Sequence, residues 1–541
     1  MFFRESDLCV AEQPGLIRIV EKIDQILQSL PPGSVLRPEE IAIKISEKSS
    51  QVSGIMECLR KHGLLYEKEY IEYSKCETLN EKEKYEQALE DEDSFECSDC
   101  QLDLTKSHSK IIKVYRISAK KIQSTTKTTK TLGELMPIIE LSTKIPPAII
   151  ANPFANTPLL RYYSRDPGFQ KSQPFKNKRV FVILHFLRDL IPFVEGMKNL
   201  GLEMSNAYFF YKDYPYPQKE GIKTWLSEQG AVVEPRSKIP QYLEQLNVMQ
   251  SASIGEILVI EDGGFIVPEV HKKFTNLIPH VIGAVEQTTR GIRNDAAIGE
   301  IQFPVISVAT SKLKGTFEPQ YIGRAVVENI KRLLPDISLN GKTVGLFGYG
   351  TIGREIADWF RSNKSIVTVF DPSPENRLLA HQNGFPLATS PEENATNKNF
   401  VIGASGNESI NSKVIAHLTH GTYIVSASSE LYEVDVDELT RLQSRMAELK
   451  NPSGETIGTD FELPPSNRVI HVIANGYPIN FWGFESMPNE ASDLIMSLIF
   501  LCACELGSRS MSAKGIDAEF VNALAGDHKL ADKFLEIHKQ G

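Results

Sequence analysis

This chain contains few cysteines and tryptophans, and it has no excess of positive charge. Its 541 residues include seven cysteines and three tryptophans, and acidic residues outnumber basic ones. An odd number of widely spread cysteines does not make the disulfide framework of a small secreted protein, so we expect a reducing compartment, the cytoplasm. The formal net charge of −10 argues against a whole-protein interface with nucleic acid or an anionic membrane. Any such contact would have to be local.

Long hydrophobic runs are also missing from the sequence. The first residues, MFFRESDLCVAEQPGL, contain no apolar stretch of signal-peptide length. The most apolar later run, LIMSLIFLCACEL at 494–506, is too short to span a bilayer. We therefore expect no membrane partner and interpret this run as a buried helix.

Residues 1–80 are expected to form a small α+β domain. Apolar residues at helical spacing predict a helix over 16–30, which ends at Pro31. Two short helices and an alternating strand pair follow within 35–73, an order that resembles a winged helix-turn-helix. The helix from about Ser50 to His62 would then face DNA, but it has few basic residues. A DNA partner and a protein partner both stay open for this domain.

The segment 81–130 is strongly biased in charge, acidic first and then basic, which indicates a solvated lobe and a linker. Its CSDC motif has the two-residue spacing of zinc ligands. A structural zinc site here would use four side chains: Cys76, Cys97, Cys100 and His108. The second ligand pair is incomplete, so free thiols in a small lobe are the alternative interpretation.

From about residue 145 onward, short apolar strands alternate with helical stretches. Examples are RVFVILHF, EILVIEDGG, HVIGAVEQ, FPVISVAT, KTVGLFGYG, SIVTVFD, NFVIGASG, TYIVSASS and RVIHVIAN. This rhythm predicts an α/β protein with two doubly wound, Rossmann-like parallel sheets. We expect one domain over 145–335, completed by about 480–541, and a dinucleotide-binding domain over 336–480.

The second of these domains opens with a glycine motif between a predicted strand and a predicted helix. Gly348 allows a tight turn, Gly350 lets the backbone approach a diphosphate, and Gly353 permits close packing of helix on strand. Asp371 follows the next strand, eighteen residues past Gly353, where a carboxylate binds the ribose hydroxyls of a dinucleotide. No Lys or Arg directly follows Asp371, which favours NAD over NADP. Backbone contacts from Thr351 and Ile352 belong to the same motif.

Several segments in order, VIEDGG, VEQTTRGI, PVISVATSKLKGTFEPQYIGRAVVENIKRL, GKTVGLFGYGTIGREIA and IANGYPINF, resemble the S-adenosylhomocysteine hydrolase family over roughly residues 145–505. The resemblance implies bound NAD, a nucleoside-like substrate and a homo-oligomer. It also implies transient oxidation of the ribose 3'-hydroxyl, elimination of the thiol, addition of water and reduction of the ketone.

The resemblance assigns roles to individual residues. Lys314 matches the lysine that serves the oxidation. The positive charge of a nearby nicotinamide would favour the neutral amine, which can act as a base. The remaining implied catalytic residues are Glu318, Asp262 and His185. The implied substrate-binding residues are Glu286, Gln287 and Thr288, and the implied further NAD contacts are Thr289 and Asn480.

Departures from the family pattern keep two interpretations open. Gln287 stands where the family has a carboxylate, Glu318 where it has an aspartate, and Gly323 where it has a cysteine. One interpretation is an enzyme of one-carbon metabolism that acts on S-adenosylhomocysteine or an altered nucleoside. The other is a catalytically silent sensor of NAD or a nucleoside, coupled to the N-terminal domain. Family resemblance does not choose between them.

Overall fold

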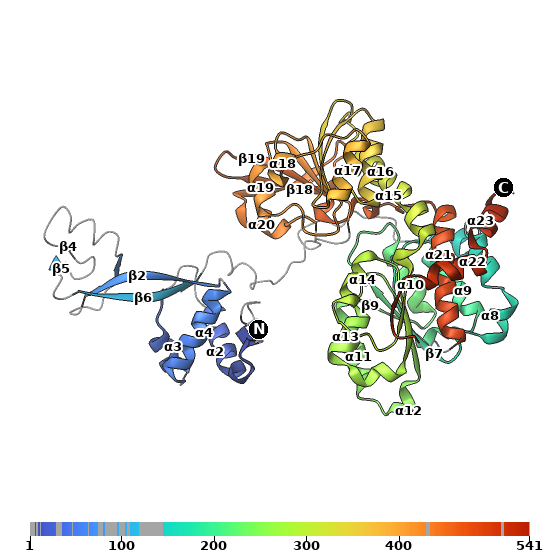
Figure 1. Ribbon diagram of the computed structural model, residues 1–541, viewed down its shortest axis with the longest axis horizontal. Coiled ribbons are helices and arrows are strands. Elements are labelled where there is room, and N and C mark those ends of the chain that lie inside the picture. Colours follow the sequence, from blue (N-terminus) through green and yellow to red (C-terminus); the bar gives the residue numbers. More distant parts are fainter. Residues whose placement is uncertain are drawn as a thin grey trace. The chain divides into compact units, whose positions relative to one another are not determined.

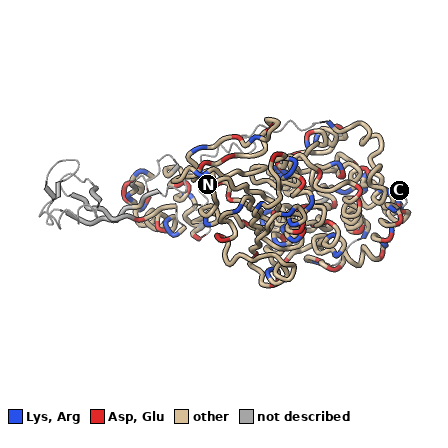
Figure 2. The backbone as a smooth tube through the Cα atoms, turned by 90° about the horizontal axis from the view of Figure 1, so that it is seen from above, with Lys and Arg blue, Asp and Glu red and all other residues tan. Residues whose placement is uncertain are grey.

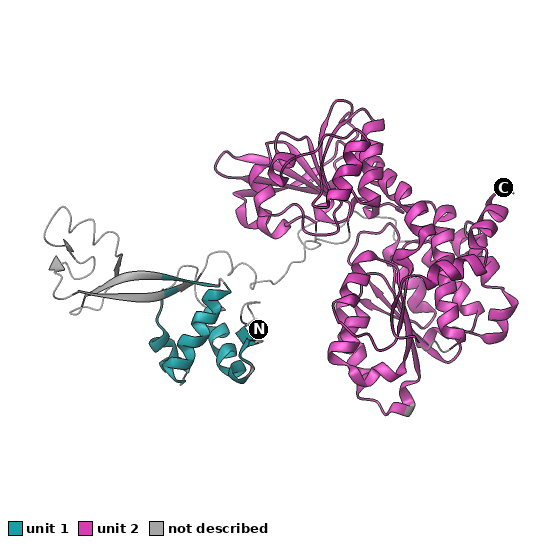
Figure 3. Ribbon diagram, in the orientation of Figure 1, with its two compact units in different colours: residues 1–135 teal, residues 136–541 magenta. Residues whose placement is uncertain are grey.

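The computed structural model describes residues 6, 9–10, 12–28, 35–45, 47–62, 64–73, 79–81, 95–96, 103–104, 109–117, 144–428, 433–509 and 513–539. The chain divides into two compact units, residues 1–135 and residues 136–541 (Figure 3). The predicted zinc ligands Cys76, Cys97, Cys100 and His108 lie outside the described residues.

The N-terminal unit begins with helices packed around one apolar cluster (Figure 1). They are η1 Pro14–Leu16, α2 Ile17–Gln28, α3 Pro38–Ile45 and α4 Ser49–Lys61. Apolar residues of α2 recur at helical spacing, and Val20, Ile23 and Leu27 are fully buried. Helix α4 coincides with the helix expected from about Ser50 to His62.

The sheet of this unit has the strand order β1-β6-β2-β3. These strands are β1 Val35–Leu36, β2 Leu65–Tyr73, β3 Leu79–Glu81 and β6 Ser109–Ile117, and a separate pair is β4 Phe95–Glu96 with β5 Asp103–Leu104. The expectation of a strand pair within 35–73 is corrected by the structure. Strand β2 is one long strand, and it pairs antiparallel with β6. The sheet therefore crosses the boundary predicted at residue 80. The winged-helix interpretation itself stays a prediction.

The basic residues at the end of α4 are already paired with acids. Arg60 Nη2 lies 2.5 Å from Glu57 Oε1, and Lys61 Nζ lies 3.0 Å from Glu12 Oε1. Along the described backbone, basic and acidic residues are interspersed (Figure 2). A DNA phosphate would have to compete with these carboxylates for the two cations.

The first sheet of the larger unit, here called sheet 1, has the order β20-β12-β11-β10-β7-β8-β9, with every pair parallel. Its strands are β7 Lys178–Ile183, β8 Ala207–Tyr211, β9 Val232–Pro235, β10 Glu256–Glu261, β11 Val281–Glu286, β12 Pro304–Ser307 and β20 Gly515–Asp517. Strand β20 comes from near the end of the chain and pairs with β12, so the last segment returns to sheet 1.

Helices cover both faces of sheet 1, as a buried parallel sheet requires. Val180 and Val182 of β7 join the core with α9 Leu190–Asn199, α10 Lys219–Glu228 and α21 Asn489–Ser508. Phe181 and Ile183, on the opposite face, join the core with α11 Ile239–Asn247 and α13 Ile266–Lys273. The doubly wound fold predicted from the sequence is confirmed.

The second sheet, here called sheet 2, has the order β14-β13-β15-β16-β19-β18-β17. Its strands are β13 Thr343–Phe347, β14 Ile366–Phe370, β15 Phe400–Gly403, β16 Thr422–Ser426, β17 Arg445–Lys450, β18 Thr456–Leu463 and β19 Arg468–Ile473. The run from β14 to β19 is parallel, whereas β18 and β17 add an antiparallel edge. Helices α15 Lys312–Leu333 and α16 Thr351–Ser362 pack on one face.

Helix α21 is the buried helix expected from the apolar run at 494–506. Its length and composition would suffice to cross a membrane, but 83% of its most apolar window is buried inside the protein. Phe500, Cys502 and Cys504 are fully buried, and α21 packs on β10 and β11 of sheet 1. The prediction of a core helix is confirmed.

Candidate active site

The glycine motif forms the turn between β13 and α16. Gly348 has φ +96°, and a side chain there would meet Ala404 O at 2.6 Å. A side chain at Gly353 would lie 2.1 Å from Gly348 O, so close packing of α16 requires this glycine. Gly350 differs from both, because no atom in the described part of the chain lies within 4 Å of an added Cβ. That position faces open space beside the start of α16.

The start of α16 is suited to an anion. Thr351 and Ile352 occupy its first two positions, directly after Gly350, where backbone N–H groups have no partner within the helix. The diphosphate of a dinucleotide fits a helix start flanked by glycine backbone. We infer that this turn provides the diphosphate site.

Asp371 lies at the end of β14, next to the glycine turn, and is 5% exposed. Its Oδ2 accepts from Tyr349 N at 2.6 Å and Asn376 Nδ2 at 3.1 Å, and its Oδ1 accepts from Ser373 N at 2.8 Å. A carboxylate can accept about four hydrogen bonds, so it has capacity left for a ribose hydroxyl. Arg377 Nη1 donates to the backbone oxygens of Asp371 and Pro372 at 3.0 and 2.9 Å, so a guanidinium lies nearby even though no basic residue directly follows Asp371.

Two further predicted NAD contacts lie in different surroundings. Asn480, on η10 Ile479–Phe481, is 3% exposed, and its Nδ2 donates to Ser486 Oγ at 3.0 Å. Its Oδ1 is buried and has no hydrogen-bond partner in the described ranges of the chain. Such an orphaned oxygen fits an amide donor of a bound ligand. Thr289 is exposed at the start of α14 Thr289–Ala296.

The predicted catalytic residues Asp262 and His185 come together at the carboxyl edge of sheet 1. Asp262 follows β10, His185 follows β7, and Gln287 follows β11. His185 Nε2 lies 2.9 Å from Asp262 Oδ2, and Gln287 Nε2 donates to the same oxygen at 2.5 Å. In parallel α/β sheets, ligands bind beyond the carboxyl ends of the strands. The structure thus assembles residues that lie far apart in the sequence.

Lys212, which the sequence analysis did not identify, completes this group. It follows β8, is 2% exposed, and forms an ion pair and hydrogen bond with Asp262 Oδ1. Burial alone would raise the pKa of the Asp262 carboxyl, but the Lys212 ammonium and His185 hold that pKa well below its usual range. Asp262 is therefore a fixed anion, better suited to orienting His185 than to accepting a proton.

Aromatic rings surround His185. Its Nδ1 is 2.6 Å from the Tyr216 hydroxyl, and its ring centroid is 4.2 Å from that of Phe481. Phe481 directly follows Asn480, so the predicted catalytic residue His185 lies beside a segment that carries a predicted NAD contact. The His185 side chain keeps 23% exposure, which leaves it accessible from one side.

Glu286 is fully buried and bonded to the protein itself. Its carboxylate accepts from Gly264 N at 2.8 Å, from Thr288 N at 2.7 Å and from the Thr288 hydroxyl at 2.6 Å, as well as from Gly263 N. These contacts shape the turns that carry Asp262 and Gln287. Direct substrate contacts of Glu286, Gln287 and Thr288 stay predictions.

Glu286 shares its surroundings with two other buried carboxyl groups, Glu261 and Asp295, and one oxygen from each lies within 4.8 Å of the others. Burial and the neighbouring carboxyls raise the pKa of Glu286 to about 8 and that of Asp295 to about 9. Among the residues that the structure describes, neither oxygen of Asp295 has a hydrogen-bond partner. The group is therefore most stable when it carries protons.

We expect Asp295→Asn to stabilise the protein increasingly as the pH rises. Because the folded-state pKa of Asp295, about 9, exceeds the ordinary value of 3.8, the folded state holds the proton more tightly, and stability falls as the pH rises through that window. An asparagine does not ionise, and its amide can donate to Glu261 or Glu286. The gain near pH 8 should be roughly 1–3 kcal/mol, measured by chemical denaturation.

The control for this prediction is Asp532→Asn on the exposed face of α23 Leu530–His538. It should change the free energy of unfolding by less than about 0.5 kcal/mol at any of these pH values. An equal pH dependence of wild type and Asp295→Asn would show that Asp295 is not held protonated.

Lys314 and Glu318 form a second polar group, one turn apart on α15. They form an ion pair and a hydrogen bond, with side-chain exposures of 13% and 24%. Of their side-chain hydrogen bonds and ion pairs in the described residues, none reaches Asp262 or His185. Gly323, one to two turns further on, packs so tightly on α16 that a Cβ would lie 2.4 Å from Glu355 Cβ. The family's cysteine at this position has no room here.

Two other carboxyl groups were missed by the sequence analysis. Glu485 lies 2.9 Å from Arg188 Nε, and burial and Asp189 raise the pKa of Glu485 to about 7, in the range useful for proton transfer. Glu433 is fully buried and accepts from Ser405 N and Gly406 N at 3.0 Å, which fixes the loop after β15. A glutamate in a loop, outside any motif of defined spacing, gives little sequence signal.

Comparison with known proteins bears on the family and on the NAD-binding domain. Residues 321–482 match the family model described as S-adenosyl-L-homocysteine hydrolase, NAD binding domain. An adenosylhomocysteinase of Pyrococcus abyssi is 27% identical over 352 residues, covering 63% of this chain and 79% of that protein. An S-inosyl-L-homocysteine hydrolase of Methanopyrus kandleri is 28% identical over 339 residues, covering 61% and 76%.

Solved structures give weaker matches. A formate dehydrogenase of Granulicella has a TM-score of 0.34 at 14% identity, covering 54% of this chain and 82% of that chain. A phosphoglycerate oxidoreductase of Vibrio cholerae has a TM-score of 0.30 at 14% identity, covering 48% and 89%.

The fold and the glycine turn define an α/β protein with a dinucleotide-binding domain on sheet 2. Within that class, the chain is similar to S-adenosylhomocysteine hydrolases, and residues 321–482 match the NAD-binding domain of that family. The match to an NAD-binding domain supports the sequence-based prediction that NAD is the cofactor.

Proposed function

We propose that this protein binds NAD and uses it to oxidise a ribose hydroxyl of a nucleoside-like substrate transiently. The observation that carries the proposal is the convergence of His185, Asp262, Lys212 and Gln287 at the carboxyl ends of adjacent strands of sheet 1. The family's domain for NAD supplies the second half of the site. When bound, NAD accepts a hydride from the carbon of a secondary alcohol.

In this proposal Lys314 takes the proton of the ribose hydroxyl. Glu318, one turn away, holds the resulting ammonium through their ion pair. The longer side chain of Glu318, in place of the family's aspartate, reaches Lys314 directly. Their partial burial keeps water from competing for the proton.

His185 would then exchange protons with the leaving thiol and the incoming water at Nδ1, where the Tyr216 hydroxyl gives way to the substrate. Its Nδ1 is held by the Tyr216 hydroxyl and its Nε2 by Asp262, so the ring is fixed in orientation. Asp262 acts through His185 and is a positioning residue in this scheme. Lys212 keeps the Asp262 carboxylate charged.

The base of the nucleoside is left open by the relatives, because one is named for an adenosyl and another for an inosyl substrate. The test is to incubate the full chain with S-adenosylhomocysteine and, separately, with S-inosylhomocysteine. We expect release of a free thiol and a transient absorbance of reduced nicotinamide with one of them. Reduced nicotinamide without thiol would indicate oxidation of a different substrate. The absence of both signals would contradict the proposed chemistry.

A second candidate function is a sensor that binds NAD or a nucleoside without turnover. The Lys212–Asp262 ion pair favours it, since it occupies one oxygen of a carboxylate at the centre of the site. The N-terminal unit would pass ligand occupancy to a partner. Because Arg60 and Lys61 are paired with acids, we propose a protein rather than DNA as that partner. A salt-dependent gel shift with mixed-sequence DNA would contradict this choice.

A further inference from the structure

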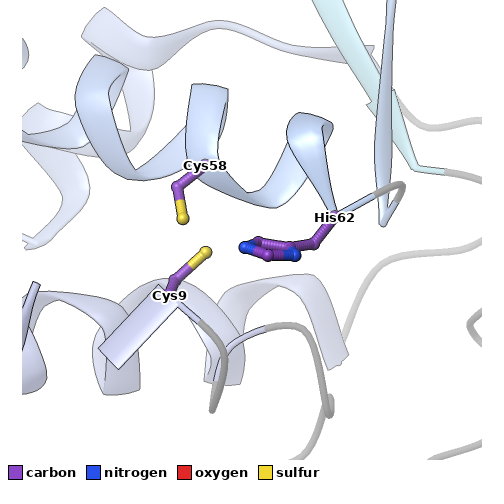
Figure 4. A group of neighbouring side chains, drawn as sticks. All are labelled: Cys9, Cys58 and His62. Carbon is purple, nitrogen blue, oxygen red and sulfur yellow. The ribbon is translucent and has the colours of Figure 1, made fainter. Parts of the chain in front are cut away.

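We propose that Cys9, Cys58 and His62 hold a structural zinc ion in the N-terminal unit. Figure 4 shows the two sulfur atoms and the imidazole of His62 pointing toward one another across two helical segments. One ligand atom from each residue lies within 4.8 Å of the others. This site differs from the one that the CSDC motif suggests, and it is independent of the proposed function.

The candidate ligands come from two helical segments, Cys58 with His62 from one and Cys9 with Glu12 from the other. Cys58 and His62 are four residues apart at the end of α4, so their side chains lie on one face of the helix. Cys9 lies on a helical turn near the start of the chain, where Gln13 N donates to Cys9 O at 2.9 Å. Glu12, three residues after Cys9, shares the face that Cys9 presents to α4.

Glu12 is positioned to supply the fourth ligand. Its Oε1 lies 2.9 Å from His62 Nε2, and its Oε2 is 3.7 Å from Cys58 Sγ. Ligands of a tetrahedral zinc ion, bonded at about 2.0–2.3 Å, are separated by roughly 3.3–3.8 Å. The observed cluster needs only small side-chain movements to reach that geometry.

Charge and burial also fit zinc. Binding would release the two thiol protons to solvent, and two thiolates with one carboxylate around Zn²⁺ leave a single negative charge. Lys61 Nζ, 3.0 Å from Glu12 Oε1, balances that charge. Cys9 and Cys58 are 1% and 5% exposed, which shields the thiolates from oxidation. Thiolate ligands select zinc over magnesium or calcium.

The ion would tie the beginning of the chain to α4. The apolar cluster of these helices is small, and small units of this kind are commonly stabilised by a metal. Cys9 is the first cysteine of the sequence and lies far from Cys58 along the chain. Sequence spacing therefore gave no sign of the site.

The test uses the full chain, stripped of metal with a chelator and titrated with Zn²⁺, while bound zinc is measured by elemental mass spectrometry. We expect one tightly bound zinc per chain and, with Co²⁺ in its place, the charge-transfer absorbance of thiolate-bound cobalt. The double variant Cys9→Ser, Cys58→Ser should lose both signals. The matched variant Cys97→Ser, Cys100→Ser should keep both.

A second variant, which is expected to keep the fold, separates loss of zinc binding from misfolding. His62 keeps 20% side-chain exposure, so His62→Gln should fold as judged by circular dichroism, yet bind zinc at least about tenfold more weakly. The proposal is overturned if the wild-type chain binds no zinc. It is also overturned if zinc is lost from the Cys97, Cys100 variant but kept by the Cys9, Cys58 variant, or if His62→Gln binds as tightly as wild type.

Discussion

Gly350→Val is expected to abolish binding of NAD while leaving the fold intact. None of the described residues lies within 4 Å of a Cβ at Gly350, and the residue has an ordinary φ of −71°, so valine meets no steric barrier there. The side chain would instead fill the space beside the start of α16 that the diphosphate requires. We expect the affinity for NAD to fall at least about 100-fold, which is roughly 3 kcal/mol.

The measurement is calorimetric titration of the dialysed variant with NAD, alongside its melting temperature. Gly526→Val, in α22 Phe520–Asp527, is the matched control, because that glycine also has nothing within 4 Å of an added Cβ. It should bind NAD normally. Gly353→Val should fail to fold, since its Cβ would lie 2.1 Å from Gly348 O. Equal affinity for NAD in Gly350→Val and Gly526→Val would contradict the assignment of the diphosphate site.

Lys314→Ala is expected to retain NAD but to lose redox turnover. The side chain lies on α15, outside the glycine turn, so its removal leaves the diphosphate site unchanged. A positioned base contributes about 10²–10⁴-fold to a proton transfer, and we expect a decrease of at least about 10³-fold in the rate of nicotinamide reduction. The measurement is single-turnover absorbance after addition of the substrate identified in the thiol-release assay.

Lys312→Ala is the control, because Lys312 is exposed on the same helix, two residues earlier. It should reduce nicotinamide at the wild-type rate. Wild-type reduction by Lys314→Ala would show that another group takes the hydroxyl proton. Glu485, with its pKa raised to about 7, is the first alternative to examine.

The sequence predicted the parts of the fold that have strong local patterns. Strands β7, β10 and β13 contain short apolar runs, glycine-containing turns follow β10 and β13, and each of the three strands was predicted. Strand β17, Arg445–Lys450, was missed, because its residues are mostly exposed and it lies at the edge of sheet 2. Strand β18, which pairs antiparallel with β17 and β19, was missed as well, although its residues are mostly buried.

The candidate site was predicted unevenly. Asp262 and His185 were found through family resemblance, and the structure brings them together. Lys212 was missed, since the aromatic strand before it, β8, gave no clear pattern and its partner lies 50 residues away. Pairings of this kind depend on the strand order of sheet 1, which local sequence does not encode. The cluster of Cys9, Cys58 and His62 was also missed, because helix packing brings together residues that lie far apart in the sequence.

The most direct test of the central claim is titration of the dialysed full-length protein with NAD in a calorimeter. We expect one NAD site per chain, and NAD or NADH in the supernatant when the freshly purified protein is denatured. A protein that binds neither NAD nor NADP at millimolar concentration, while remaining folded by circular dichroism, would contradict the account.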